Sequence, residues 1–200
     1  MRSRIFAHRG LWGAHEQNSL KAISDAVNHG FGVETDMRLY KSKVVLSHDP
    51  VFSSNTSELN SILPSQAPLA LNIKMDGLMP YLDRSLLNES NCFFFDGSLP
   101  ELYKYRTAGL DTACRVSEFE SGLPWLSKVI WVDSFQSEWW IGGKLIDELS
   151  EKSLVVIVSP ELHGRNHLLA WEKISEYFSS GNPNIAICTD FPFEFEKQLQ

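Results

Sequence analysis

The sequence is poor in cysteine and has no long apolar run. Its three cysteines, Cys92, Cys114 and Cys188, are widely separated, and each sits in or beside an apolar run. This spacing favours buried thiols over a disulfide framework or a zinc site. No run approaches the ~20 consecutive apolar residues of a membrane helix, and the first residues lack the apolar core of a signal peptide. We therefore expect a cytoplasmic protein without a transmembrane segment.

Positive charge is also scarce. The chain has 18 Lys and Arg residues against 25 Asp and Glu, for a formal net charge of −7. Such a chain is not expected to bind nucleic acid, and any phosphate recognition must depend on a few local cations. Its 200 residues are 43% hydrophobic, enough for one substantial core, and no linker is visible. We therefore predict a single domain over residues 1–200, while the composition leaves the oligomeric state open.

Short apolar runs alternate with helical patterns along the whole chain. Strands are expected at 5–7, 31–36, 44–46, 69–74, 92–96, 113–117, 129–132, 154–158 and 185–188. Helices are expected at 20–27, 80–88, 98–107, 138–151 and 166–178, with a loop at 50–68 and a brief segment at Pro124 and Trp125. Such alternation predicts a parallel sheet with helices outside it, either open or closed into a barrel.

Polar and potentially reactive side chains follow the expected strands. They are His8, Glu34 with Asp36, His48, Asn72 with Lys74, Asp96, Glu118, Asp133 and Asp190. In an open sheet a ligand uses only the strands at the switch point, whereas a closed barrel brings all carboxyl ends of its strands to one mouth. Because so many strands contribute such residues, we predict an α/β fold of the (β/α)8 TIM-barrel type, in a small form.

The segment from Val33 to Asp49 is the densest in such residues. It is expected to form a strand, a tight polar turn at 41–43 and a second strand that leads to His48. Glu34 and Asp36 are two residues apart, so in a strand their side chains point to the same face. Two carboxylates on one face form either a site for a hard cation or a costly repulsion.

Four motifs in this order resemble the glycerophosphodiester phosphodiesterase family: His8-Arg9-Gly10, Glu16 to Leu20, Glu34-Thr35-Asp36 and Ser47-His48-Asp49. Weaker matches at 72–74 and 189–192 extend the resemblance over nearly the whole chain. The resemblance implies a TIM barrel related to the phospholipase-C-like phosphodiesterases, with Mg²⁺ or Ca²⁺ as cofactor. It also implies metal-dependent hydrolysis of a glycerophosphodiester, or of a related small or lipid-derived phosphodiester.

The resemblance also assigns roles to single residues. They are general acid-base catalysis for His8 and His48, phosphate binding for Arg9 and Lys74, and metal binding for Glu34, Asp36 and Asn72. Asn72 departs from the family pattern, because it stands where a third acidic ligand is usual. Its amide oxygen can coordinate Mg²⁺ or Ca²⁺ but brings no charge. A later carboxylate such as Glu118 is the alternative ligand.

Several alternatives stay open at this point. Either histidine can be the base, and the loop at 50–68 is too short for the inserted small domain that helps to shape the glycerol pocket in many family members. The alcohol group of the substrate is therefore not specified. A barrel that binds a phosphodiester with weak or lost turnover is one alternative function, because Asn72 weakens the cation site. A lyase that releases a cyclic phosphate is another.

Overall fold

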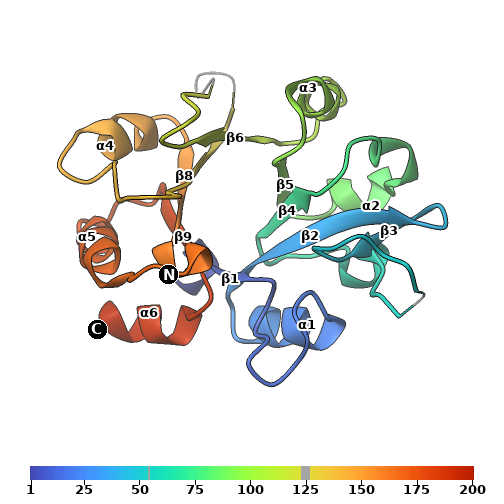
Figure 1. Cartoon of the computed structure of the whole chain (residues 1–200), viewed down its shortest axis with the longest axis horizontal. Helices are drawn as coiled ribbons and strands as arrows, with labels where there is room; N and C mark the ends of the chain where they lie inside the picture. Colours follow the sequence, from blue (N-terminus) through green and yellow to red (C-terminus); the bar gives the residue numbers. More distant parts are fainter. Residues whose placement is uncertain (54, 123–126) are drawn as a thin grey trace. The chain divides into compact units, whose positions relative to one another are not determined.

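The structure is a computed structural model that describes residues 1–53, 55–122 and 127–200 (Figure 1). The chain forms two compact units, Met1–Thr112 and Ala113–Gln200. The brief segment expected at Pro124 and Trp125 lies outside the described residues. The expected single domain over 1–200 stays a prediction.

The first unit contains four parallel strands in the order β5-β4-β2-β1, with β3 antiparallel to β2. The strands are β1 (Ile5–His8), β2 (Gly32–Tyr40), β3 (Lys43–Leu46), β4 (Leu69–Ile73) and β5 (Cys92–Phe95). The helices are α1 (Leu20–Asn28), α2 (Arg84–Asn88) and α3 (Leu99–Thr107), with 3₁₀ turns at Arg2–Arg4, Leu59–Ile62 and Met79–Tyr81. The predicted strands and the predicted helices at 20–27 and 98–107 are therefore present. The helix predicted at 80–88 is instead a 3₁₀ turn followed by the short helix α2, because Leu82 between them is extended. The described residues of the loop at 50–68 contain one 3₁₀ turn.

The hairpin of β2 and β3 closes through a two-residue turn. Lys41 and Ser42 both have positive φ, of 48° and 62°, between the paired residues Tyr40 and Lys43. Positive φ at both central positions is the geometry whose twist matches that of the flanking strands. Because β3 pairs with its second half, β2 extends four residues beyond the predicted end at Asp36 (Figure 1).

Helix α1 begins at Ser19, whose hydroxyl accepts a hydrogen bond from the backbone N–H of Ala22. This is the usual capping contact for the unpaired donors of a first helical turn. Its buried residues Ala22, Ile23 and Ala26 recur at three and four residues, as the sequence predicts.

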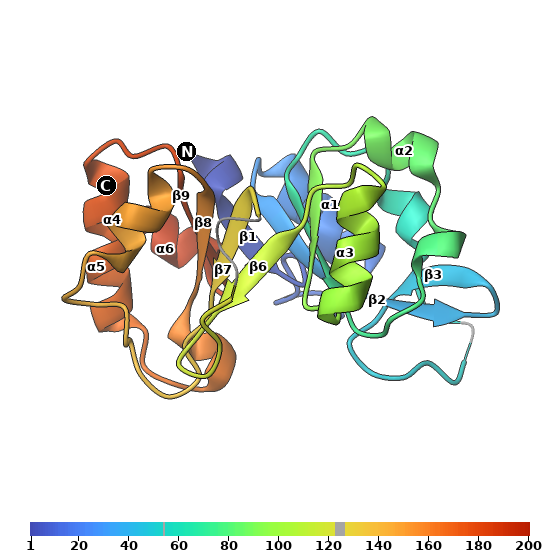
Figure 2. The ribbon, with the colours of Figure 1, turned by 90° about the horizontal axis from the view of Figure 1, so that it is seen from above.

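The second unit contains four parallel strands in the order β9-β8-β7-β6. They are β6 (Ala113–Val116), β7 (Val129–Val132), β8 (Leu154–Val158) and β9 (Ile185–Thr189), and the helices are α4 (Leu145–Ser150), α5 (Leu168–Ser179) and α6 (Pro192–Gln198). A 3₁₀ turn covers Pro160–His163 (Figure 2). Helix α4 is shorter than the predicted 138–151, because Gly142 has a φ of 86° and lies before the helix starts.

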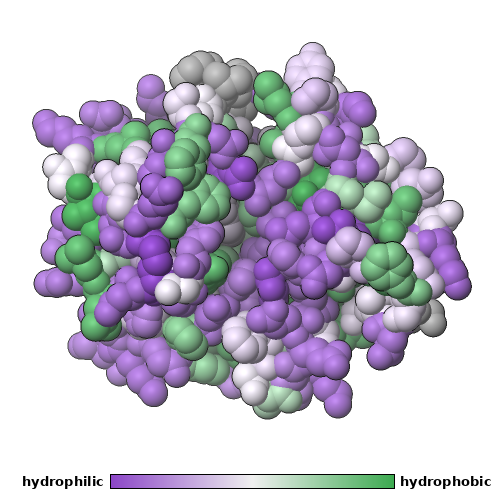
Figure 3. All heavy atoms as spheres, viewed as in Figure 1, coloured by the Kyte–Doolittle hydropathy of each residue, from purple (hydrophilic) through white to green (hydrophobic). Residues whose placement is uncertain are grey.

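The cores lie on the strands. All five residues of β4 and all five of β9 are buried, as expected for parallel strands that are covered on both faces. Hydrophilic side chains predominate on the face shown in Figure 3, and hydrophobic ones are scattered among them. Within the described ranges no helix combines the length and the apolar character needed to cross a membrane.

Candidate functional site

Strands β1 and β2 bring four of the predicted site residues together in the first unit. His8 is paired with Glu34 in the parallel register, so both side chains project from the same face. His8 Nε2 lies 3.9 Å from Glu34 Oε2. The backbone N–H of Arg9 contacts Glu34 twice, at 2.9 Å from its carbonyl oxygen and at 3.2 Å from Oε2. The end of β1 is thus tied to the first carboxylate of the Glu34-Thr35-Asp36 motif.

The turn after β1 explains the glycine of the His-Arg-Gly motif. Arg9 and Gly10 have φ values of 58° and 81°, and Leu11 N donates to Ala22 O at 2.8 Å. A Cβ on Gly10 would lie 2.6 Å from the carbonyl carbon of Ala22 on α1. Only glycine combines the left-handed backbone with this close approach. The position of Arg9 therefore depends on the contact of this turn with α1.

Asp36 is the centre of the cluster. It is 1% exposed, and its two oxygens face two cations, with Arg9 Nε 3.0 Å from Oδ2 and Lys74 Nζ 3.2 Å from Oδ1. Both contacts are ion pairs, and neither Arg9 Nε nor Asp36 Oδ1 has a hydrogen-bond partner among the described residues. The cations that were predicted to bind phosphate are thus held beside a buried carboxylate.

Asn18 orients Asp36 and was missed as a site residue. Its Nδ2 donates to Asp36 Oδ2 at 2.9 Å, and its Oδ1 accepts hydrogen bonds from Thr35 Oγ1 and from the backbone N–H of Asp36. Asn18 has a φ of 60°, a conformation that asparagine tolerates better than most residues. Asn18 belongs to the Glu16 to Leu20 motif, but the sequence assigned it no role of its own in the site.

Glu34 has an unusual proton affinity. Burial raises the pKa of Glu34, which is 2% exposed, and the charge of Asp36 raises it further. His8, Lys74 and Arg9 lower it in part, and the result is a pKa of about 7. Near neutral pH this carboxyl group is therefore poised between its protonated and ionised forms.

Asn72 lies beside Asp36, since the two are paired residues of β4 and β2. It is 6% exposed, and its Nδ2 donates to Asp96 Oδ2 at 3.2 Å. Its Oδ1 is buried and accepts no hydrogen bond from the part of the chain that the structure describes. A buried amide oxygen without a donor is rare in folded proteins. The amide oxygen is thus available as a ligand atom for a bound cation.

His48 follows β3 at the edge of this cluster. A hydrogen bond from Ser47 N to Asp36 O and one from Arg38 Nε to His48 O fix its backbone. Its side chain is 45% exposed, and its Nδ1 lies 2.9 Å from Asp49 Oδ1. The hydrogen bond with His48 lowers the pKa of Asp49. His48 thus presents a ring that is oriented by a carboxylate and open to solvent.

A pocket of about 320 Å³ joins His48 to Arg9 in the first unit. Nearly all of its lining residues carry hydroxyl, amide or charged groups. They are Arg9, Glu16, Gln17, Asn18, Ser19, Leu46, Ser47, His48, Asp49, Asn55, Thr56 and Ser57. Such a lining suits a polar ligand better than an acyl chain, because an acyl chain gains little from polar walls.

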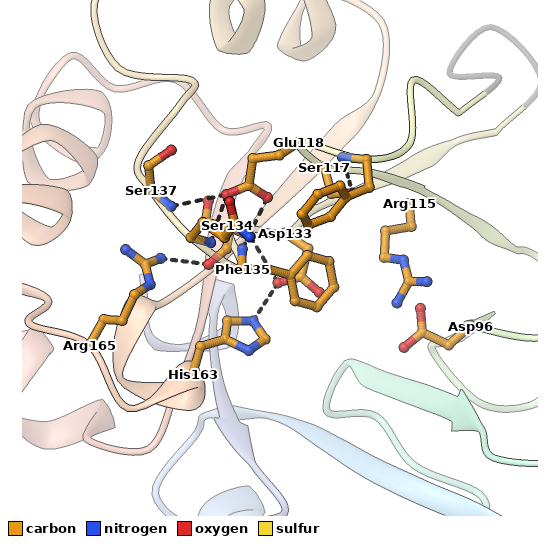
Figure 4. Close-up of polar contacts among 12 residues, drawn as sticks. Asp96, Arg115, Ser117, Glu118, Asp133, Ser134, Phe135, Ser137, His163 and Arg165 are labelled. Carbon is orange, nitrogen blue, oxygen red and sulfur yellow. Dashed lines mark hydrogen bonds and ion pairs between the residues drawn. The ribbon is translucent and has the colours of Figure 1, made fainter.

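The structure shows how the later carboxylates are used in the second unit (Figure 4). Glu118 accepts hydrogen bonds from three successive backbone N–H groups, those of residues 135–137. Partial burial raises the pKa of Glu118, but these donors outweigh it and leave the pKa below its ordinary value. Asp133 Oδ1 accepts from Ser134 N and lies 2.7 Å from His163 Nε2. Both carboxylates thus hold loops of their own unit.

All seven predicted site residues lie in the first unit. Ion pairs or strand pairing connect His8, Arg9, Glu34, Asp36, Asn72 and Lys74, while His48 shares the pocket with Arg9. Among the residues described, no group of three or more His, Cys, Asp or Glu side chains is arranged to hold a metal ion. Asn72, the third residue predicted to bind the metal, carries an amide and is not among those residue types.

The sequence matches no family model, and the search of curated proteins found no match. Solved structures do match it. A glycerophosphodiester phosphodiesterase from Agrobacterium tumefaciens str. C58 matches with a TM-score of 0.64 and 13% identity, over 97% of this chain and 97% of that chain. A candidate glycerophosphoryl diester phosphodiesterase from Silicibacter pomeroyi DSS-3 gives 0.63 and 14%, over 98% and 92%. A glycerophosphoryl diester phosphodiesterase from Parabacteroides distasonis ATCC 8503 gives 0.54 and 15%, over 96% and 84%.

These likenesses establish the fold. The chain has an α/β fold of the TIM-barrel class, with four parallel strands in each unit over the described ranges, so the predicted fold class is confirmed. The predicted resemblance to glycerophosphodiester phosphodiesterases is confirmed as a likeness of structure over nearly the full length. An identity of 13 to 15% carries the fold and not the activity.

Proposed function

We propose that this chain is a metal-dependent phosphodiesterase that hydrolyses a glycerophosphodiester or a related small phosphodiester. The observation that carries the proposal is the ion-pair cluster in which Asp36 lies between Arg9 and Lys74, with Glu34 and His8 beside it. The two cations can offset negative charge on a phosphate group, and the imidazole can transfer a proton there. The likeness to phosphodiesterase structures supports the same reading.

The residues present fit a hard divalent cation. Glu34, Asp36 and Asn72 supply oxygen atoms only, which are the ligands that Mg²⁺ and Ca²⁺ prefer. The Oδ1 atom of Asn72 is buried without a hydrogen-bond donor in the described part of the chain, so a cation there would satisfy it. A bound cation would neutralise negative charge on the phosphate oxygens. Mg²⁺ or Ca²⁺ is therefore proposed as the cofactor.

The remaining chemistry belongs to the side chains of the chain. The Arg9 guanidinium can bind two non-bridging oxygens of the diester at once, and the Lys74 ammonium adds a point charge. One of His8 and His48 removes the proton from the attacking water or hydroxyl group, and the other protonates the departing alkoxide. Proton transfer of this kind contributes typically about 10²–10⁴-fold to the rate. Either order of the two roles gives the same products.

The polar pocket between Arg9 and His48 supports a small, polar alcohol group. Its volume of about 320 Å³ and its hydroxyl, amide and carboxylate lining suit a polyol or a positively charged head group. The carboxylates of Glu16 and Asp49 can pair with such groups. We therefore propose a deacylated, water-soluble diester as the substrate.

A panel of diesters tests the proposal. Glycerophosphodiesters with choline, ethanolamine and glycerol head groups, and one acylated lysophospholipid, are incubated with Mg²⁺, Ca²⁺ or Mn²⁺, and phosphorus NMR follows the products. The expected result is cation-dependent release of a phosphate monoester from the deacylated diesters, which the exposed-site control His29→Ala retains. A cyclic phosphate as the final product would show a lyase instead. Thermal stabilisation by the diesters without any product would show a binding protein.

A further inference from the structure

The neutral amide of Asn72 sets a requirement that another residue must meet. If the cation site of the proposed function exists, its third oxygen carries no charge, and an amide can present either its oxygen or its nitrogen to the site. A cation needs the oxygen. Something must therefore hold the amide with Nδ2 turned away from Glu34 and Asp36.

Asp96 meets this requirement. It follows β5 directly, and its Oδ2 accepts a hydrogen bond of 3.2 Å from Asn72 Nδ2. A carboxylate accepts hydrogen bonds and does not donate them, so it selects the orientation in which Nδ2 faces Asp96. The same contact leaves Oδ1 of Asn72, which is buried and without a donor among the described residues, as the atom that remains for a ligand.

The backbone places Asp96 for this contact. Asn72 pairs with Phe95 in the parallel register of β4 and β5, so the next residue begins the turn after the strand. Asp96 has a φ of 62°, a left-handed conformation that aspartate and asparagine adopt more readily than other residues with a side chain. Hydrogen-bonded carboxylates behind metal ligands orient those ligands and make them more basic.

We propose that Asp96 is a positioning residue for the divalent cation and supplies, through the Asn72 amide, the negative charge that the third ligand lacks. This inference rests on the proposed function, because it assumes the cation site at Glu34, Asp36 and Asn72. It goes beyond that function in assigning a role to a residue that belongs to none of the recognised motifs. The alternative is that the hydrogen bond only satisfies the amide of Asn72 at the end of its strand.

Three variants of the full chain separate these readings. Asp96→Asn keeps a hydrogen-bond acceptor and a residue that tolerates the left-handed backbone, but removes the charge. Asp96→Ala removes the acceptor as well. The double variant Asn72→Asp with Asp96→Asn exchanges the two groups, so that residue 72 carries the carboxylate and residue 96 the amide. Asp147→Asn on an exposed site of α4 is the matched control.

The affinity for Mn²⁺ alone, measured by the loss of its free electron paramagnetic resonance signal, is the main readout. We expect about tenfold weaker binding for Asp96→Asn and at least as large a loss for Asp96→Ala, in the range found for groups behind metal ligands. The double variant should recover binding to within about threefold of wild type. Unfolding of the metal-free variants, followed by circular dichroism, shows whether each one is folded.

The outcomes are distinct. The role of Asp96 would be overturned if folded Asp96→Asn and Asp96→Ala bound Mn²⁺ as tightly as the wild type while Glu34→Gln abolished binding. That result would leave the proposed function intact. If the double variant is folded but does not recover Mn²⁺ binding, the claim that Asp96 supplies negative charge to the cation site would also be refuted. Absence of Mn²⁺ binding in the wild type would refute the cation site itself, and the inference with it.

Discussion

Replacement of Glu34 by glutamine should stabilise the metal-free protein at neutral and alkaline pH. The pKa of Glu34 is raised from 4.5 to about 7 in the folded chain, chiefly because the group is buried and lies beside Asp36. Below pH 4.5 the carboxyl is protonated in both states, so it costs the fold nothing. Between pH 4.5 and 7 only the unfolded state releases the proton, so stability falls as the pH rises and reaches a plateau above pH 7.

The size of the effect follows from the two pKa values. Their difference of roughly 2.5 corresponds to about 3 kcal/mol, since each pKa unit is worth 1.36 kcal/mol. Glutamine cannot ionise and has nearly the shape of the protonated carboxyl. We therefore expect Glu34→Gln to match the wild type near pH 4.5 and to exceed its free energy of unfolding by up to about 3 kcal/mol at pH 8.

Urea unfolding in the presence of a chelator, followed by tryptophan fluorescence at a series of pH values, measures this difference. Titrating groups far from Glu34 affect both proteins alike and cancel in the comparison, whereas Asp36 and His8, which interact with its charge, contribute to the difference. A difference between variant and wild type that does not change from pH 4.5 to pH 8 would refute the reasoning about burial. Divalent cations should reduce the advantage of the variant, because they favour the ionised carboxylate of the wild type.

Three further predictions concern the other site residues. His8→Ala and His48→Ala should each lower the rate of diester hydrolysis by about 10²–10⁴-fold with an unchanged circular dichroism spectrum; substantial activity in both would remove the acid-base mechanism. Arg9→Lys should raise KM about tenfold, because lysine cannot bind two phosphate oxygens at once; steady-state kinetics with an unchanged KM would contradict this. Gly10→Ala should destabilise the fold by at least about 2 kcal/mol because of its left-handed backbone and close contact, whereas Gly13→Ala, with open space around it, should be nearly neutral in urea unfolding; equal stabilities would count against the tight turn.

Much of the fold could be predicted from the sequence because short buried strands produce apolar runs that are easy to recognise. The strand at 69–74 is an example, since all of β4 is buried and apolar except for Asn72. The ends of strands and helices were harder to predict. The extension of β2 to Tyr40 depends on pairing with β3, and the helix predicted from residue 138 begins only at Leu145, after a pair of glycines.

The candidate site was only partly predictable for a similar reason. His8, Glu34 and Asp36 belong to motifs whose spacing along one strand or turn is visible in the sequence. The contacts of Asn18 and Asp96 depend on left-handed backbone conformations and on partners 18 and 24 residues away. The Glu16 to Leu20 motif contains Asn18 but does not reveal its contacts, and no recognised motif contains Asp96. Asparagine in a polar loop and aspartate at a strand end are both common without any role in a site.

The turn that carries Arg9 is coupled to helix α1, because Gly10 lies against the backbone of Ala22. Within the described residues, this helix contributes no side chain to the ion pairs of the site. A bulkier side chain at Ala22 or Ala26, both fully buried on α1, would push the helix away and carry the turn with it. The reach of Arg9 towards a bound anion is thus adjustable at a distance. Under the proposed function, a change in helix packing can alter substrate preference while every residue of the pocket stays the same.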